Sequence, residues 1–295
     1  MLTKTIGDIS VTRVQESLGP GFFPEFLFPD WDPQVLSENK TWLEPYYFDS
    51  ASGKFMSSIH TWVVRTKDHV ILIDTCTGNH KQRPAFERFN MLNTDFLARL
   101  KLAGVDPLEV DYVLCTHLHV DHVGWNTQLE DGRWVPTFPN ARYVFSKIEH
   151  DRWNPLLNQD SNTGINQNVY NDSVLPIVEA GMADMTTGNF AIGDCLTIEA
   201  APGHTLGHTV IKAQSQGSHA LFSGDVMHHP LQVLNPHWNS RFCELPEVAR
   251  STRRRVLEHC CESNALLMPA HFGYPHACKV SDSHGKFKLN FDFSE

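Results

Sequence analysis

Four residues with metal-binding side chains lie within six consecutive positions near the middle of this 295-residue chain. They are His117, His119, Asp121 and His122. Imidazole nitrogens bind zinc, iron, nickel and related divalent ions, and a carboxylate balances part of the ion's charge. The density of such side chains predicts a metal centre built on this segment.

The residues just before this segment predict how it is supported. Residues 111–115 form a short apolar run that is typical of a buried strand. If the backbone stays extended beyond this strand, its two-residue period places His117 and His119 on one side, where they can share an ion. The chain must then turn, so we expect Asp121 and His122 to reach a second position.

Three further metal-binding side chains follow predicted strands in the second half of the chain. They are His204 after a predicted strand at 196–200, Asp225 after one at 220–222, and His271 after one at 265–268. The end of a strand combines rigid support with open space, which a catalytic site needs. Their recurrence at strand ends indicates one divided metal site.

The remaining pattern predicts an α/β fold. Further strands are expected at 5–17, 60–66, 69–75, 141–145 and 209–213, and helices at 93–102, at 147–157 and from 244 or 246 to about 261. Strands outnumber those of a simple alternating βα pattern, which favours two sheets with helices outside. No Ser/Gly linker divides the chain, so we expect a single domain over residues 1–295.

Residues 19–50 are rich in proline and aromatic side chains. We expect them to form an irregular arm, because so long a segment without clear periodicity is usually functional. We interpret the arm in one of two ways. It is either a lid, or a segment that covers a sheet edge or packs on the partner in a homodimer.

Composition narrows the function classes. The net charge of −10, from 34 acidic and 24 basic residues, disfavours a nucleic-acid partner. No stretch approaches the roughly 18 apolar residues that span a membrane, and residues 1–18 lack the pattern of a signal peptide. The seven cysteines include no Cys-x-x-Cys pair. These features predict a cytoplasmic protein in a reducing compartment.

The ordered motifs resemble those of the metallo-β-lactamase superfamily over nearly the whole chain. They are Asp74 after an apolar strand, Thr116-His117-x-His119-x-Asp121-His122, Pro202-Gly203-His204-Thr205, Ser223-Gly224-Asp225 and His271. The resemblance implies an αβ/βα four-layer sandwich, with two packed mixed β-sheets and helices outside. Because no ligand position is missing or replaced by cysteine, the dinuclear hydrolase branch fits best.

The resemblance also implies a ligand set. His117, His119 and His204 would hold one ion, Asp121, His122 and His271 a second, and Asp225 would bridge them. Two such ions, most simply zinc although iron, manganese or cobalt suit the same ligands, would share a hydroxide that attacks the substrate. Asp121 is the candidate to orient this hydroxide or to transfer a proton, and Asp74 is expected to accept a hydrogen bond from a ligand histidine or from Thr116.

The expected substrate is a small ester-like molecule, with a lactone first and a phosphotriester or aryl ester next. Many lactonases of the superfamily carry a tyrosine three residues after the bridging aspartate, but this chain has His228 there, followed by His229. We expect His228 either to act in catalysis or to hydrogen-bond at the pocket wall. Aromatic residues near the ligands are candidates to line an apolar pocket: Trp125, Trp238, Phe272 and Tyr274.

Two other activities share this ligand pattern. A glyoxalase II-like thioester hydrolase would need a basic glutathione-binding cluster, which the C-terminal region does not show. A di-iron redox enzyme of the same fold would carry an attached flavin domain and a carboxylate in place of a histidine ligand, and this chain has neither. Hydrolysis of an ester-like bond is therefore the leading hypothesis.

Overall fold

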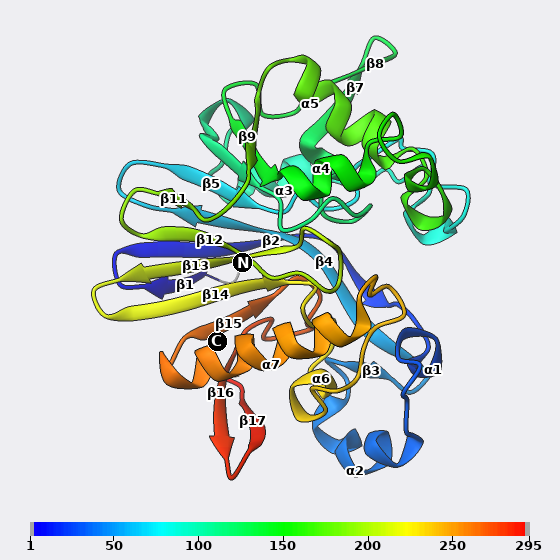
Figure 1. The fold of residues 1–295 in the computed structure, drawn as a ribbon, viewed down its shortest axis with the longest axis vertical. Helices are drawn as coiled ribbons and strands as arrows, with labels where there is room; N and C mark the ends of the chain where they lie inside the picture. Colours follow the sequence, from blue (N-terminus) through cyan, green and yellow to red (C-terminus); the bar gives the residue numbers. More distant parts are fainter. Residues whose placement is uncertain (1–2, 293–295) are drawn as a thin grey trace. The chain divides into compact units, whose positions relative to one another are not determined.

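Two large β-sheets dominate residues 3–292, the part of the chain that this computed structural model describes (Figure 1). The chain divides into two compact units. Unit 1 comprises residues 1–16 and 59–191, and unit 2 comprises residues 17–58 and 192–295. The expectation of a single domain over residues 1–295 stays a prediction.

The first sheet has the strand order β1-β2-β4-β5-β6-β9-β10, with β3 paired to β4. Its strands are β1 (Thr3–Ile6), β2 (Ile9–Pro20), β3 (Phe48–Asp49), β4 (Lys54–Arg65), β5 (Val70–Ile73), β6 (Tyr112–Leu114), β9 (Arg142–Ser146) and β10 (Ala183–Thr186). The last four run parallel to one another. Their carboxyl ends therefore meet at one edge of the sheet, where the histidine segment begins.

Short helices and turns surround this sheet within unit 1. The helices are α3 (Phe96–Leu102), α4 (Lys147–Trp153) and α5 (Leu175–Glu179), with a π-helical turn at Tyr170–Val174 and a hairpin of β7 (Thr127–Glu130) and β8 (Arg133–Pro136). α3 ends as expected before Gly104, whose φ of 75° suits glycine. Leu72, Val113 and Tyr143 are buried in the core of this unit.

The second sheet has the order β11-β12-β13-β14-β15-β16-β17. Its strands are β11 (Phe190–Ile192), β12 (Leu196–Ala200), β13 (Thr209–Ser215), β14 (Ser218–Gly224), β15 (Leu266–Pro269), β16 (Cys278–Ser283) and β17 (Lys286–Asn290). Only the β14–β15 pair is parallel among the pairs described for this sheet, so both large sheets are mixed. The prediction of an α/β fold with two sheets is confirmed.

The aromatic arm contains regular helices and a strand, whereas an irregular segment was expected. It contains α1 (Pro24–Leu27), α2 (Pro33–Leu43) and β3, and Asp32 caps α2 by accepting a hydrogen bond from the Gln34 amide. Phe28, Leu43 and Tyr47 are completely buried in the core of unit 2. The irregular arm was therefore a wrong prediction, because these aromatic side chains pack against distant parts of the chain that local periodicity does not reveal.

The opening segment also differs from expectation. Residues 5–17 were predicted as one strand, but the chain turns at Gly7, with a φ of 58°, so that β1 and β2 form an antiparallel hairpin. In unit 2, α6 (Leu231–Leu234) and α7 (Pro246–Glu262) complete the helices. Among residues 3–292, no helix combines the length and apolar character needed to cross a bilayer.

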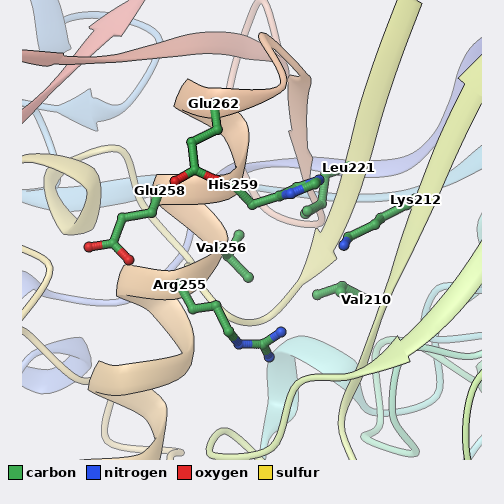
Figure 2. Close-up of a pocket in the computed structure, with 8 residues that line it drawn as sticks. All are labelled: Val210, Lys212, Leu221, Arg255, Val256, Glu258, His259 and Glu262. Atoms are coloured by element: carbon green, nitrogen blue, oxygen red, sulfur yellow. The ribbon is translucent and has the colours of Figure 1, made fainter.

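A hollow of about 290 Å³ lies between α7 and the strands β13 and β14 of unit 2 (Figure 2). Its floor contains Val210, Leu221 and Val256, and its rim carries Lys212, Arg255, Glu258, His259 and Glu262. Lys212 already pairs with Glu199 at 2.8 Å. None of the candidate metal ligands lines this hollow.

Candidate metal centre

The four ligand candidates of unit 1 gather at the carboxyl end of β6. The ring centroid of His117 lies 4.5 Å from that of His119 and 4.0 Å from that of His122. Asp121 Oδ1 lies 3.6 Å from His122 Nε2. The three histidines are buried, and Asp121 is partly exposed. The structure therefore places all four side chains in one cluster.

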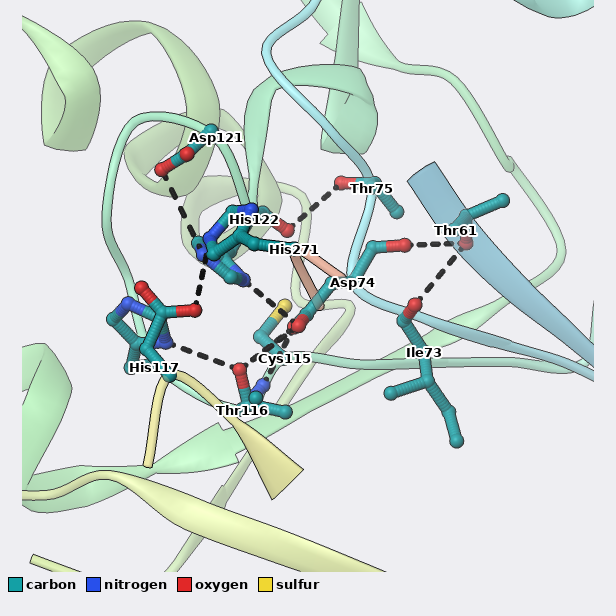
Figure 3. A network of polar contacts seen from close by, with 12 residues as sticks. Thr61, Ile73, Asp74, Thr75, Cys115, Thr116, His117, Asp121, His122 and His271 are labelled. Atoms are coloured by element: carbon teal, nitrogen blue, oxygen red, sulfur yellow. Dashed lines mark hydrogen bonds and ion pairs between the residues drawn. The ribbon is translucent and has the colours of Figure 1, made fainter. Parts of the chain in front are cut away.

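Asp74 supports this cluster from the end of β5 (Figure 3). Its Oδ1 accepts a hydrogen bond from the Thr116 amide at 2.8 Å, and its Oδ2 accepts one from the Thr116 hydroxyl at 2.9 Å. His122 Nδ1 lies 2.8 Å from Oδ2. Asp74 itself has a φ of 55°, which is uncommon for a residue other than glycine. Asp74 was expected to accept a hydrogen bond from a ligand histidine or from Thr116, and it accepts hydrogen bonds from Thr116 and from the candidate ligand His122.

These contacts assign the tautomers of two histidines. Since a carboxylate only accepts, His122 Nδ1 carries the proton shared with Asp74, and in the neutral form that a metal ligand needs, Nε2 carries a lone pair. The Thr116 hydroxyl gives its one hydrogen to Asp74, so His117 Nδ1, at 3.0 Å, must donate to the Thr116 oxygen. His117 Nε2 then also presents a lone pair, as a metal ligand requires.

Buried polar contacts hold the backbone of the histidine segment. Glu149 accepts hydrogen bonds from the Leu118 amide at 3.0 Å and from the Trp153 indole at 2.8 Å. The Val120 amide donates to the Asn166 side chain at 3.1 Å. The path between the candidate ligands is therefore fixed by side chains from outside the segment, as a preorganised site needs.

Replacing Asp74 with asparagine is expected to weaken metal binding about 10- to 100-fold. The amide has one acceptor oxygen, whereas Asp74 receives three donors, so an NH₂ group would face a donor from Thr116 or His122. Competition against a chromophoric chelator measures the affinity. The exposed Asp68 in the β4–β5 turn provides the matched control, Asp68→Asn. Equal affinities of the two variants would contradict the role of Asp74.

The ligand candidates of unit 2 converge on Asp225, which follows β14. His271 Nε2 lies 2.9 Å from Asp225 Oδ1, and His204 Nε2 lies 3.3 Å from Oδ2. The amide of Asp225 donates a hydrogen bond to His208 Nε2 at 3.1 Å. All these side chains are buried. Asp225 is thus the central carboxylate of a histidine cluster, the position expected for a bridging ligand.

Gly203 allows the His204 turn to approach α7. Its φ is 134°, and a Cβ atom there would lie 2.4 Å from the backbone nitrogen of Ala249. The turn is held by hydrogen bonds from the Leu245 amide to the Gly203 carbonyl at 3.0 Å and from the Glu244 amide to the His204 carbonyl at 2.9 Å. A side chain at position 203 would therefore displace the turn that carries His204.

The residues present fit a bound cation. His271 Nδ1 lies 3.0 Å from the carbonyl oxygen of Ser58, which only accepts, so in the neutral form that a metal ligand needs, the proton lies on Nδ1 and Nε2 carries a lone pair. That lone pair faces a carboxylate oxygen of Asp225 at 2.9 Å. His122 Nε2 likewise faces a carboxylate oxygen of Asp121, at 3.6 Å. Between neutral rings and carboxylates in this arrangement a positive ion removes the repulsion of the lone pairs, and nitrogen with carboxylate oxygen is a donor set typical of zinc.

His228 and His229 differ in their surroundings although they are neighbours. His228 Nε2 lies 3.1 Å from Asp225 Oδ2, and its ring centroid lies 5.0 Å from that of His204. Burial lowers the pKa of His228 below its usual value, although Asp225 raises it, so the ring is neutral near pH 7. Among the described residues, no hydrogen-bond partner reaches His228 Nδ1.

His229, in contrast, has a structural environment. Its Nε2 donates to the Tyr47 carbonyl at 3.0 Å, and its Nδ1 accepts from the Leu231 amide at 3.3 Å. The ring stacks on Phe55 at 3.9 Å, and burial lowers the pKa of His229 to about 3. His229 therefore links the aromatic arm to the core, and only His228 faces the metal-binding cluster.

Several supporting residues were missing from the prediction. Glu149, His208 and the Ser58 carbonyl contact the ligand segments, but each comes from an element distant in sequence or carries no motif. The histidine count alone could have suggested His208, four residues after His204.

Three of the four aromatic candidates for a pocket lining belong to the buried cores instead. Trp125, Trp238 and Phe272 are at most 4% exposed. The indole of Trp125 donates to Glu16 at 2.6 Å, and Tyr274 packs beside Tyr46 at a centroid distance of 5.1 Å.

The mixed two-sheet α/β fold with histidine and aspartate clusters at strand ends defines a class of metal-binding protein. Residues 57–258 match the model of the metallo-beta-lactamase superfamily, and the chain belongs to that superfamily. A curated relative is the N-acyl homoserine lactonase AttM of Azorhizobium caulinodans, 34% identical over 55 residues. That match covers 19% of this chain and 18% of the relative's length.

Solved structures resemble the chain over almost its full length. One is described as the hydrolase AbOPH in the beta lactamase superfamily, with a TM-score of 0.81 and 24% identity, covering 99% of this chain and 98% of that one. Another is AidC, described as a dizinc quorum-quenching lactonase in complex with a product, with a TM-score of 0.75 and 21% identity, covering 100% and 98%. At these identities, the likeness shows the shared fold.

Proposed function

We propose that this chain is a metal-dependent hydrolase of small ester-like substrates, with lactones first and phosphotriesters or aryl esters next. The observation that carries the proposal is the convergence of three imidazoles, from His204, His228 and His271, on the carboxylate of Asp225. Membership of the superfamily supports it. The lactonases AttM and AidC among the similar proteins favour a lactone as substrate.

The proposed ligands are those that the family resemblance implies. His117, His119 and His204 would hold one ion, Asp121, His122 and His271 would hold the other, and Asp225 would contribute to both. We propose zinc because imidazole and carboxylate donors suit it and because the similar protein AidC is described as dizinc. The lone pairs assigned to His117, His122 and His271 support this set.

Bound divalent ions supply two effects in such a site, a water of lowered pKa and polarisation of the carbonyl or phosphoryl oxygen. The side chains then set geometry and proton positions. Asp74 keeps the His122 proton on Nδ1, and Ser58 does the same for His271. We propose that Asp121, the more exposed carboxylate of the cluster, accepts or delivers the proton that moves during hydrolysis.

We also propose a catalytic contact for His228. With the ring proton on Nε2 toward Asp225, Nδ1 of the buried, neutral ring is a hydrogen-bond acceptor. We propose that Nδ1 accepts a hydrogen bond or a proton from the reacting groups, at the position where many lactonases carry a tyrosine whose hydroxyl can assist the substrate carbonyl.

A substrate panel on metal-analysed protein tests the function. We expect hydrolysis of lactones, with slower turnover of phosphotriesters and aryl esters. Dialysis against a chelator should reduce the rate to background, and added zinc should restore it, because the residues contribute geometry but no nucleophile of their own. A panel in which only S-lactoylglutathione is hydrolysed, or in which the chelator has no effect, would overturn the proposal.

A further inference from the structure

One arginine of α7, Arg253, is buried although its side chain carries a charge. It is 1% exposed, whereas Arg254 and Arg255, the next two residues of the helix, are exposed. Burial lowers the pKa of Arg253 to about 10, so the guanidinium remains charged near pH 7. Taking a charged group out of water is unfavourable unless hydrogen bonds replace the lost water. The contacts of Arg253 must therefore compensate for its burial.

The guanidinium of Arg253 contacts the stretch of chain between β14 and α7, which includes α6. Its Nε donates to the Val226 carbonyl at 2.8 Å, and its Nη1 donates to the carbonyls of Pro236 and Trp238 at 2.8 and 2.6 Å. Its Nη1 and Nη2 also lie 3.4 and 3.3 Å from Asn239 Oδ1. Each of these oxygens belongs to a neutral group. The rigid fork of donors thus ties the beginning of this stretch to its end.

A buried glutamine of α6, Gln232, extends this network to His228. Gln232 is completely buried, and its Nε2 donates to the Trp238 carbonyl at 3.0 Å, the same oxygen that Arg253 binds. Its Oε1 accepts a hydrogen bond from the His228 amide at 2.7 Å. The backbone of His228 is therefore connected to Arg253 through one side chain and one shared carbonyl.

These contacts hold both ends of the turn from Asp225 to His228. Arg253 binds the Val226 carbonyl, one residue after Asp225, and Gln232 binds the amide of His228 itself. This turn brings His228 Nε2 to 3.1 Å from Asp225 Oδ2. Two side chains that are three residues apart keep such a distance only while the backbone between them is fixed. The geometry at Asp225 therefore depends on donors and acceptors that lie outside the cluster.

We propose that Arg253 is a positioning residue for the hydrolysis, because it holds the Asp225–His228 turn at the Val226 carbonyl and, together with Gln232, at the His228 amide. This inference rests on the proposed hydrolase function, since it assigns Arg253 a part in placing the catalytic contact proposed for His228. Arg253 acts through the backbone rather than on the substrate. A displacement of about 1 Å at a catalytic group can cost roughly 100-fold in rate, so a residue behind the site affects turnover strongly.

The first test measures lactone hydrolysis by zinc-loaded Arg253→Lys and Gln232→Met. Lysine keeps the charge but lacks the fork that reaches several carbonyls. We expect both variants to retain metal and the wild-type KM while kcat falls about tenfold or more, the pattern of a group misplaced in the transition state. Because both residues hold one turn, the double variant should lose little more than either single one. Arg254→Lys changes the exposed neighbour that pairs with Glu258, so it is the matched control and should keep the wild-type kcat.

The second test does not depend on turnover. Amide hydrogen exchange, followed by NMR, compares the amide of His228 with that of Leu267 in the buried strand β15. In Arg253→Lys and Gln232→Met, we expect the His228 amide to exchange about tenfold faster, because a weakened hydrogen bond frees it locally, while Leu267 keeps its rate.

The outcomes separate this inference from the proposed function. Absence of lactone hydrolysis in the wild type would refute the proposed function, and exchange at His228 would still decide whether Arg253 holds the turn. An unchanged kcat in folded variants that retain metal, additive losses in the double variant, or equal acceleration of exchange at His228 and Leu267 would overturn the inference.

Discussion

Replacing Asp225 with alanine is expected to remove bound metal and to reduce turnover by more than the roughly 100-fold that loss of an outer hydrogen-bond partner costs. Nε2 atoms of His204, His228 and His271 lie 2.9–3.3 Å from its carboxylate. Without the carboxylate, these rings lose the negative charge that offsets a divalent ion. Elemental analysis and lactone hydrolysis measure the two losses.

The exposed Asp194 of the same unit provides the control for this experiment. Asp194→Ala removes the same group from the surface and should keep both metal and activity. If Asp225→Ala retained wild-type metal content, the ring contacts around Asp225 would have to be explained without an ion.

Replacing Gly124 with alanine is expected to destabilise the fold around the histidine segment. A Cβ atom on Gly124 would lie 1.8 Å from the Thr77 carbonyl oxygen, so the two backbone segments must separate. They are joined by hydrogen bonds from Gly124 N to Cys76 O at 2.7 Å, Trp125 N to Thr75 O at 2.8 Å, and Thr75 N to His122 O at 2.7 Å. Losing all three would cost about 3 kcal/mol of the free energy of unfolding.

That loss corresponds to a melting temperature lower by roughly 6–12 °C for a chain of this size. Differential scanning calorimetry measures it. Gly188, also in unit 1, has open space around a built Cβ, so Gly188→Ala should melt within about 2 °C of the wild type. Equal melting temperatures of the two variants would show that the segments separate without cost.

Much of the fold was predictable where the pattern is local. Short-range signals predicted three features: the turn at residues 67–68 between β4 and β5, the glycine at position 104 just after α3, and the bounds of β12. The candidate ligands were predictable for the same reason, since histidines at strand ends stand out from core and surface patterns.

What could not be predicted depends on contacts distant in sequence. The aromatic arm has weak helical periodicity, and its helices are stabilised by rings such as Trp238, whose centroid lies 5.7 Å from those of Phe28 and Trp31. Trp125 was a pocket candidate because of its place near His122, but Glu16, far away in the sequence, binds its indole in the core. Type and spacing do not reveal such partners.

The role of Asp74 was partly predictable from the local sequence and partly visible only in the structure. Its place at a strand end was visible, and a hydrogen bond from a ligand histidine or from Thr116 was expected. The structure adds the consequence, since Asp74 orients His122 and, through Thr116, His117. The contacts of one carboxylate thereby assign the metal-facing nitrogen of two candidate ligands.

The metal content of the purified wild-type chain tests the central claim most directly. The chain should be loaded with zinc, dialysed free of excess metal, and analysed by inductively coupled plasma mass spectrometry against protein concentration. The proposed ligand set predicts two zinc ions per chain. A chain that retains no zinc, or only one ion with full lactonase activity, would contradict it.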